Sequence, residues 1–236
     1  MNLLQTFPSF KKIINSATDT CKRFPYAILS ILTATIVGLT LSDFEKIEGE
    51  YLLQKILIVA LLGLPFFITL KMFAQRYKWN FWKSFRLQTI GFFLLVLYYF
   101  LLPENFDALD KYGIQYALFY VGCLFFNAIL PFLSKNNRQG FWQYNKSLFL
   151  NFLTASLYTL VMGIGLSIAL GAMELLFKID VASKHYFQIW IVMNAFFHPI
   201  IFMSKIPEDL DALDNDFSFP KGLKVFTQYI LRKNIY

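Results

Sequence analysis

The chain has 236 residues, of which 57% are hydrophobic and only 16% are charged. Soluble domains contain about 25% charged residues, so the composition excludes an ordinary soluble domain and favours a membrane protein. The net charge of +7 does not indicate a nucleic-acid partner, because the basic residues lie in short connectors between long apolar runs.

Residues 1–23 predict an amphipathic helix on the cytoplasmic surface of the membrane. The apolar positions that share one helical face are Leu3, Phe7, Phe10, Ile14 and Ala17. Lys11 and Lys12 point away from this face. The alternative is that the same apolar face packs on the cytoplasmic ends of the membrane helices.

Residues 24–203 contain six apolar runs, and a run of about 20 apolar residues crosses a hydrocarbon core roughly 30 Å thick. The runs are Phe24–Ser42, Tyr51–Phe73, Leu87–Leu102, Tyr112–Leu133, Leu148–Phe177 and Tyr186–Met203. They predict an all-α fold, a polytopic membrane helical bundle with six transmembrane helices. The third run is short, and the fifth is long enough to tilt or to project beyond the bilayer.

Basic residues are unevenly distributed among the connectors. They are frequent in the N-terminal segment, the second and fourth connectors and the tail, and sparse in the first, third and fifth connectors. Because basic connectors stay in the cytoplasm, this alternation predicts that both termini are cytoplasmic. Trp79, Trp82 and Trp142 lie beside these basic residues, as expected for aromatic side chains at the membrane interface.

Two runs carry small residues at every fourth position, a spacing that lets two helices approach closely. In the first run these residues are Ser30, Ala34, Gly38 and Ser42. In the fifth run they are Ala155, Thr159, Gly163, Ser167 and Gly171. The stripes predict that the first and fifth spans pack in the interior of the bundle. The third span has no such stripe and is predicted to be peripheral.

The second, fourth and sixth runs each contain a proline, and we predict a helix kink at Pro65, Pro131 and Pro199. The even spacing suggests three parallel repeats, each a helical hairpin that starts from the cytoplasm. In the sixth run His198 precedes Pro199, which leaves the carbonyl of Ala195 without its helical donor. The histidine is either a neighbour of a kink or a proton- or ligand-binding group.

Polar residues within membrane spans are functional candidates because they are costly there. His198, Asn194 and Asn151 form the candidate polar intramembrane site, and a transport path requires that they converge on one cavity. Hydrogen bonds between helices are the alternative explanation for the asparagines, including Asn127. No catalytic motif or metal-binding pattern is present, so we expect no catalytic residues, no metal and no cofactor.

Residues 204–236 form the third region, an acidic connector followed by a short helix. The stretch "PEDLDALDND" fails as a calcium loop because Asp214 stands where glycine is required, and we predict a solvated connector. Leu223, Phe226 and Ile230 share one face of a helix that is too short to cross the bilayer and should lie on its cytoplasmic surface. We expect the chain to be a shortened product.

Three stretches carry a family resemblance: "RFPYAILSILTATIV", "LLGLPFFITLKMFAQR" and "IPEDLDALDNDFSFPKGLKVFTQYIL". They resemble the N-terminal membrane region of the domain-of-unknown-function family 4153, from about Phe24 to Leu231. The resemblance implies a multi-pass protein of the bacterial cytoplasmic (inner) membrane without an established activity. Family members usually continue past the last stretch, whereas this chain ends five residues after Leu231.

These observations leave three functional hypotheses. A permease-like or transport-associated role is the first, because kinked helices beside small-residue faces can gate a polar path. A structural or assembly protein that holds partners at the cytoplasmic face is the second. A membrane enzyme is the least favoured, because catalytic groups do not cluster. The lipid bilayer is the one partner that the sequence predicts, and it does not indicate an oligomeric state.

Overall fold

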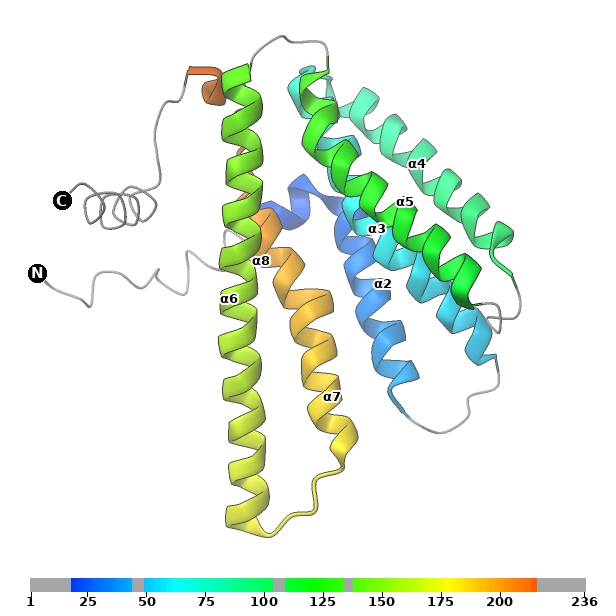
Figure 1. The fold of residues 1–236 in the computed structure, drawn as a ribbon, viewed down its shortest axis with the longest axis vertical. Coiled ribbons are helices and arrows are strands. Elements are labelled where there is room, and N and C mark those ends of the chain that lie inside the picture. Colours follow the sequence, from blue (N-terminus) through cyan, green and yellow to red (C-terminus); the bar gives the residue numbers. More distant parts are fainter. Residues whose placement is uncertain (1–17, 44–48, 104–108, 134–137, 216–236) are drawn as a thin grey trace, which may run out of the picture.

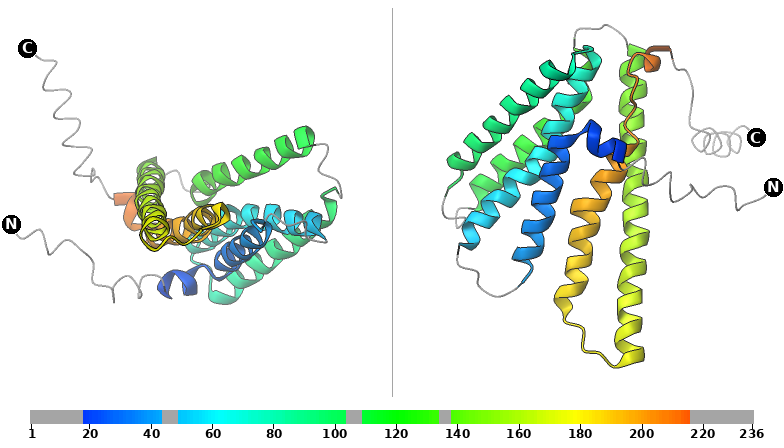
Figure 2. Two further views of the ribbon diagram at one scale, coloured as in Figure 1. Left: turned by 90° about the horizontal axis from the view of Figure 1, so that it is seen from below. Right: turned by 180° about the vertical axis from the view of Figure 1, so that it is seen from behind.

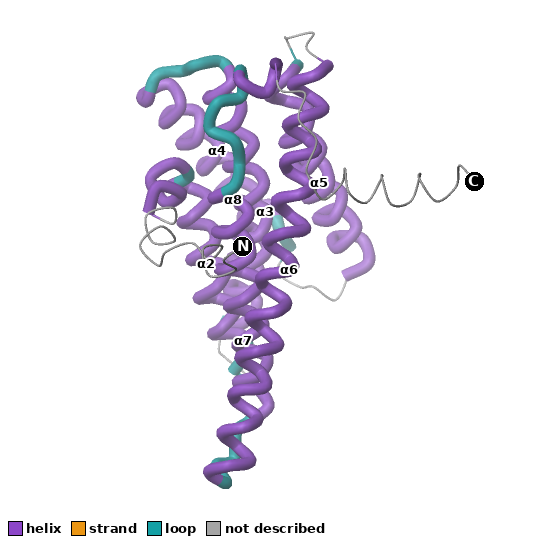
Figure 3. Tube along the Cα trace, turned by 90° about the vertical axis from the view of Figure 1, so that its left-hand side faces the viewer, coloured by secondary structure: helices purple, strands orange, loops and turns teal. Residues whose placement is uncertain are grey.

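The computed structural model describes residues 18–43, 49–103, 109–133 and 138–215, and within these ranges the regular structure is entirely helical (Figure 1, Figure 3). This confirms the all-α prediction. Most of the predicted amphipathic helix of residues 1–23 and the predicted terminal helix with Leu223, Phe226 and Ile230 lie outside the described residues. Residues 18–23 are helical.

Each of the six predicted runs corresponds to a helix or a broken helix. The elements are α2 (Pro25–Leu41), α3 (Glu50–Arg76), α4 (Phe81–Leu101), α5 (Leu109–Ile129), η3 (Leu130–Phe132), α6 (Arg138–Phe177), α7 (Ser183–Val192), η4 (Met193–Phe197), α8 (His198–Ser204) and η5 (Ala212–Asn215). Within the described residues, five helical stretches are long and apolar enough to cross a membrane, and α2 is apolar but has only 17 residues. This is compatible with a multi-pass membrane protein.

Local sequence signals set several helix boundaries. Pro25 occupies the first turn of α2, where its missing N–H costs no helical hydrogen bond. Gly49 precedes α3 with φ +85°, a left-handed conformation that glycine adopts without steric penalty. The Asn80 side chain accepts a hydrogen bond from the Lys83 backbone N–H at 3.0 Å and so caps α4.

Helix α3 is the centre of the first helix group, with α2, α4 and α5 packed around it (Figure 1, Figure 2). Phe67, Ile68 and Met72 of α3 are at most 2% exposed. A Cβ built at Gly63 would lie 2.5 Å from Ser30 Oγ, so the small Ser30 side chain of α2 packs directly on the Gly63 backbone of α3. The interior position therefore belongs to the second predicted span.

Helices α4 and α5 form the middle hairpin of the predicted repeat, yet each packs mainly on α3 and little on the other. Helix α4 is peripheral, as predicted for the third span. Its buried residues are Ser84, Gln88, Gly91 and Leu95, and its remaining faces are largely exposed.

Helix α6 and the broken rod of α7, η4 and α8 form the second helix group (Figure 1). The prediction that the fifth span fills the interior is wrong, because α6 lies at one side of the molecule. Within its apolar part, residues 148–177, only Ala155, Thr159 and Gly163 are buried. A stripe of small residues buries one narrow face, while large side chains such as Leu157 and Val161 are 63% and 60% exposed on the others.

Helix α6 has 40 residues and is therefore about 60 Å long, roughly twice the thickness of a hydrocarbon core. It begins ten residues before the predicted fifth span. Its first turns carry Gly140, Gln143 and Tyr144, all buried against other elements. This part of α6 contributes to a polar assembly at one end of the molecule.

The three prolines have different local structures. Pro65 lies inside the continuous helix α3, whereas Pro131 lies in the 3-10 turn η3 at the end of α5 and so ends that helix. Pro199 follows the π-helical turn η4, in which the His198 N–H donates to the carbonyl of Met193. The widened turn accommodates the missing N–H of Pro199 and interrupts the sixth span.

Candidate functional site

The small-residue stripe of α2 is a packing surface. Ser30, Ala34 and Gly38 are all buried. Ser30 faces Gly63 of α3, and a Cβ built at Gly38 would lie 3.2 Å from the Ile191 side chain of α7. The α2 stripe therefore contacts both helix groups.

The stripe of α6 packs on α7. A Cβ built at Gly163 would lie 3.0 Å from the Trp190 ring, and one at Gly171 would lie 3.4 Å from the Tyr186 hydroxyl. Ala155 and Thr159 are at most 3% exposed, and Ser167 is half-buried. Gly163 and Gly171 thus lie at this interface, and the four-residue spacing places Ala155, Thr159 and Ser167 on the same face of α6.

Two of the three candidate polar residues join α6 to α8. His198 Nε2 lies 3.1 Å from Ser156 Oγ, and the imidazole packs edge-to-face on the Phe152 ring. Asn151 Nδ2 donates to the Lys205 carbonyl at 2.7 Å, just beyond the end of α8. Both contacts hold the end of the sixth span against α6.

The third candidate, Asn194, does not join them. Its side chain is exposed, and its Nδ2 donates to the Trp190 carbonyl of its own helix at 2.9 Å. The three residues therefore do not converge on one cavity. Asn127 does bond between helices, since it accepts a hydrogen bond from the buried Tyr144 hydroxyl at 3.1 Å.

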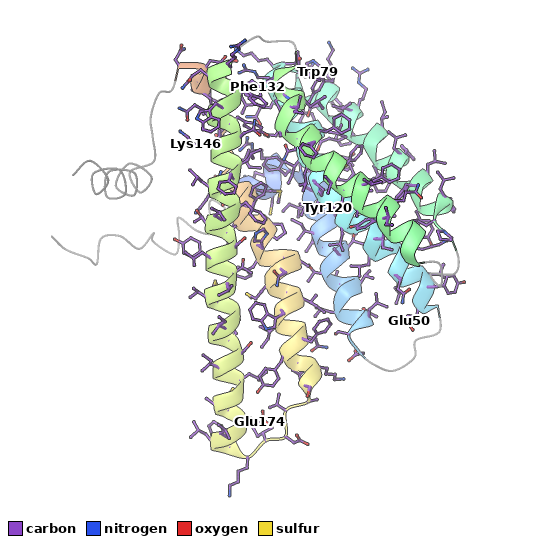
Figure 4. The ribbon with its side chains drawn as sticks, in the orientation of Figure 1. Glu50, Trp79, Tyr120, Phe132, Lys146 and Glu174 are labelled. Carbon is purple, nitrogen blue, oxygen red and sulfur yellow. The ribbon has the colours of Figure 1, made fainter. Side chains whose placement is uncertain are left out.

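Further polar groups follow the same interface between α6 and the broken rod. The Thr159 and Ser167 hydroxyls are buried and have no hydrogen-bond partner among the described residues. Near the far end of α6, the Tyr186 hydroxyl donates to Glu174 at 3.0 Å (Figure 4). Between Thr159 and Ser167, the Trp190 ring packs against Gly163.

The densest polar assembly lies where α3 ends and α6 begins, and Arg76 is at its centre. The Arg76 side chain is only 1% exposed. Its guanidinium contacts Asp211 at 2.9 Å and both carboxylate oxygens of Asp214 at 3.0 Å, and it donates to the Leu210 carbonyl at 2.8 Å. The guanidinium also stacks on the Phe132 ring, with Cζ 4.6 Å from the centroid. Such a planar, multiply bonded arginine stabilises a defined geometry.

Arg23, two residues before the start of α2, makes the second set of contacts with the same chain segment. It donates to the carbonyls of Ile206 and Pro207, each at 2.6 Å, and to Gln75 Oε1 at 2.9 Å. Gln75 in turn donates to the Glu208 carbonyl. We call the group of Arg23, Arg76, Asp211 and Asp214 the arginine clasp.

The arginine clasp joins the two helix groups. Arg23 and Arg76 belong to the group around α3, and the segment 206–215 follows α8. Asp214 also lies against Gly140 in the first turn of α6, so close that a Cβ there would collide with its carboxylate. A carboxylate at this position is favoured by the helix dipole.

The prediction that the stretch "PEDLDALDND" is a solvated acidic connector is wrong for Leu210, Asp211 and Asp214, although Glu208 and Asp209 are exposed. Ile206 and Leu210 are 2% and 3% exposed, and the Asp214 side chain is 18% exposed. The burial of these residues could not be predicted from local composition, because in the sequence Arg76 looks like any basic residue that follows a membrane span. The three-residue spacing of Asp211 and Asp214 was the one available signal, since such residues share a helical face.

The surroundings of three basic side chains at this end of the molecule shift their pKa values. Burial lowers the pKa of the Arg23 guanidinium, and the nearby charge of Glu208 opposes this shift. The hydrogen bond to Asp211, and then its charge, raise the pKa of the exposed Lys78 amine. Burial lowers the pKa of the Lys205 amine.

Among the described residues, no group of three His, Cys, Asp or Glu side chains is placed to hold a metal ion. Comparison of the chain with family models, with curated proteins and with solved structures found no match in any of the three. The resemblance to family 4153 accordingly stays an expectation from the sequence, and the functional argument depends on the residues themselves.

Proposed function

We propose that the chain is a six-span protein of the bacterial cytoplasmic membrane with both termini in the cytoplasm. The five long apolar helices, the apolar α2 and the alternation of basic connectors support this topology. Glu50 and Glu174 lie at the end of the molecule opposite Trp79 and Phe132, as this orientation requires (Figure 4). The arginine clasp is then cytoplasmic. The arrangement in three parallel repeats remains part of the proposal, supported by proline spacing.

Cysteine labelling tests the orientation. In a background with Cys21 and Cys123 replaced by serine, a cysteine at Asn80 should resist an impermeant thiol reagent in intact cells. A cysteine at Ser183, exposed at the start of α7, should react. Both cysteines should react after the cells are permeabilised, which controls for local accessibility. The reverse pattern in intact cells would contradict the proposed topology.

The geometry best supports a structural or assembly role, in which the protein holds partners at its cytoplasmic face. The observation that carries this proposal is the arginine clasp. It fixes an acidic segment on the ends of α3 and α6, and it leaves Glu208, Asp209 and Ala212 exposed. A segment held in one conformation loses less entropy on binding than a free tail. A basic surface on a partner is the complement of this acidic face.

Site-specific photo-crosslinking tests this role. A photoreactive residue at Ala212 should form a discrete protein adduct in cells, and Arg76→Gln should abolish the adduct because the segment leaves its place. Lys78→Gln is the matched control, since it removes an exposed partner of the same Asp211 and should keep the adduct. The same photoreactive residue at the exposed Leu97 should give none. An adduct that Arg76→Gln leaves unchanged would contradict the proposal.

A transport-associated role is the second candidate, favoured by the polar groups between α6 and the broken rod. Asn151 and Glu174 are separated by 23 residues, or about 35 Å of helix, enough to cross a hydrocarbon core. Between them lie the hydroxyls of Thr159 and Ser167, which have no hydrogen-bond partner in the part of the chain that the structure describes. Proton flux into proteoliposomes that exceeds that of empty vesicles, and that His198→Phe slows, would favour this candidate over the assembly role.

A further inference from the structure

A groove of about 510 Å³ lies between α2, α3 and α4, away from the arginine clasp and from the α6 interface. Its walls are mostly apolar and include Leu29, Val59 and Val96. Two wall residues, Leu29 and Phe100, are 50% and 73% exposed, so the groove opens on the surface of the helix group. Its volume lies within the range of about 300–1,000 Å³ that is usual for small-molecule sites.

The length of the groove matches one leaflet of a bilayer. Along α3 its lining runs from Ile56 to Phe67, which corresponds to about 16 Å of helix. Half of a hydrocarbon core is roughly 15 Å. An extended apolar chain from one leaflet therefore fits the groove along its length.

A buried cation lies at the end of the groove nearest the start of α3. Lys55 is only 7% exposed, and its Nζ lies 5.6 Å from the centre of the Tyr99 ring, which lines the groove. Among the residues that the structure describes, no carboxylate forms an ion pair with Lys55. An ammonium group in apolar surroundings is costly unless an anion lies beside it.

We propose that the groove binds one anionic phospholipid of the outer leaflet. Its headgroup phosphate pairs with Lys55, and one of its acyl chains lies along α3 from Ile56 to Phe67. Lys55 is six residues into α3, about 8 Å from the helix start, which places the amine near headgroup depth. The cation supplies the selectivity for an anionic headgroup, and the apolar walls supply the binding of the chain.

Native mass spectrometry of the full chain, purified in detergent and titrated with phosphatidylglycerol or phosphatidylcholine, tests this site. We expect phosphatidylglycerol to bind more tightly, and Lys55→Gln to weaken its binding about tenfold, the loss of one charge-assisted contact. Lys178→Gln, an exposed lysine near the same end of the molecule, should have no effect. Ala60→Phe, which fills the groove, should abolish binding of both lipids, and Ala169→Phe on an exposed face of α6 should not.

Two results would overturn the lipid site. One is equal binding of the two lipids that Lys55→Gln does not change. The other is binding that survives Ala60→Phe in a protein whose thermal unfolding remains cooperative. The inference depends on the proposed membrane location of the helices, and the choice of the outer leaflet on the proposed orientation, but neither depends on the assembly role. Failure to detect the crosslinked adduct at Ala212 would therefore contradict the assembly role and not the lipid site.

Discussion

Arg76→Gln should lower the free energy of unfolding by about 2–4 kcal/mol, the largest effect that we expect from a single substitution in this chain. Removing one partner of a buried ion pair leaves the other charges without compensation. Here Asp211 and Asp214 would both lose their guanidinium, and the Leu210 carbonyl would lose its donor. We place the value about 1 kcal/mol below the usual range of about 3–5 kcal/mol because both carboxylates retain some solvent contact.

Thermal and denaturant unfolding in detergent measure this effect. The matched control is Lys78→Gln, which breaks an exposed pair with Asp211 and should lower the stability far less than Arg76→Gln does. In Arg76→Met combined with Asp211→Asn and Asp214→Asn, most of the lost stability should return, because no buried charge is left unpaired and Lys78, which loses Asp211, is exposed to solvent. If Arg76→Gln and Lys78→Gln have equal effects, the arginine clasp does not stabilise the fold.

Gly163→Leu should destabilise the contact between α6 and α7 by about 1–3 kcal/mol, because overpacking a close helix contact forces the helices apart. A Cβ at this position already lies 3.0 Å from the Trp190 ring, and the further atoms of leucine have no free space. Trp190 is a rigid ring within a helix and has few alternative rotamers. The loss should appear as a lower thermal midpoint in detergent.

The control for this substitution lies two residues further along the same helix. Gly165 has no neighbouring atom within 4 Å of its built Cβ, so Gly165→Leu changes helix propensity in the same way without a clash. It should be neutral or slightly stabilising. Trp190→Ala should restore much of the stability lost in Gly163→Leu. Equal midpoints for the two glycine variants would refute a tight contact at Gly163.

The positions of the helices could be predicted well, since apolar run length and periodicity are local properties. The predicted first run, Phe24–Ser42, differs by one residue at each end from α2. The fifth was predicted too short because the first ten residues of α6 are polar and resemble a connector. Those turns are helical because they pack against the arginine clasp, which is a tertiary effect.

The candidate polar site was only partly predictable. His198 and Asn151 contact other segments, whereas Asn194 donates its hydrogen bond within its own helix. The spacing of residues along one helix cannot show where a neighbouring helix lies. The small residues of α6 correctly indicated a packing face. They could not show that α6 lies at the side of the molecule, since one narrow face suffices for one neighbour.

Composition and pattern by themselves determined that the chain forms apolar helices, where most of those helices begin and end, and which faces pack closely. The tertiary structure alone decided that α3 is central, that a groove remains beside Lys55, and that the acidic segment is held by arginines. Asp211 is 135 residues from Arg76 in the chain, and Ile206 is 183 residues from Arg23. Burial of those charges depends on which helix ends meet in space, and no local pattern encodes a contact over such a separation.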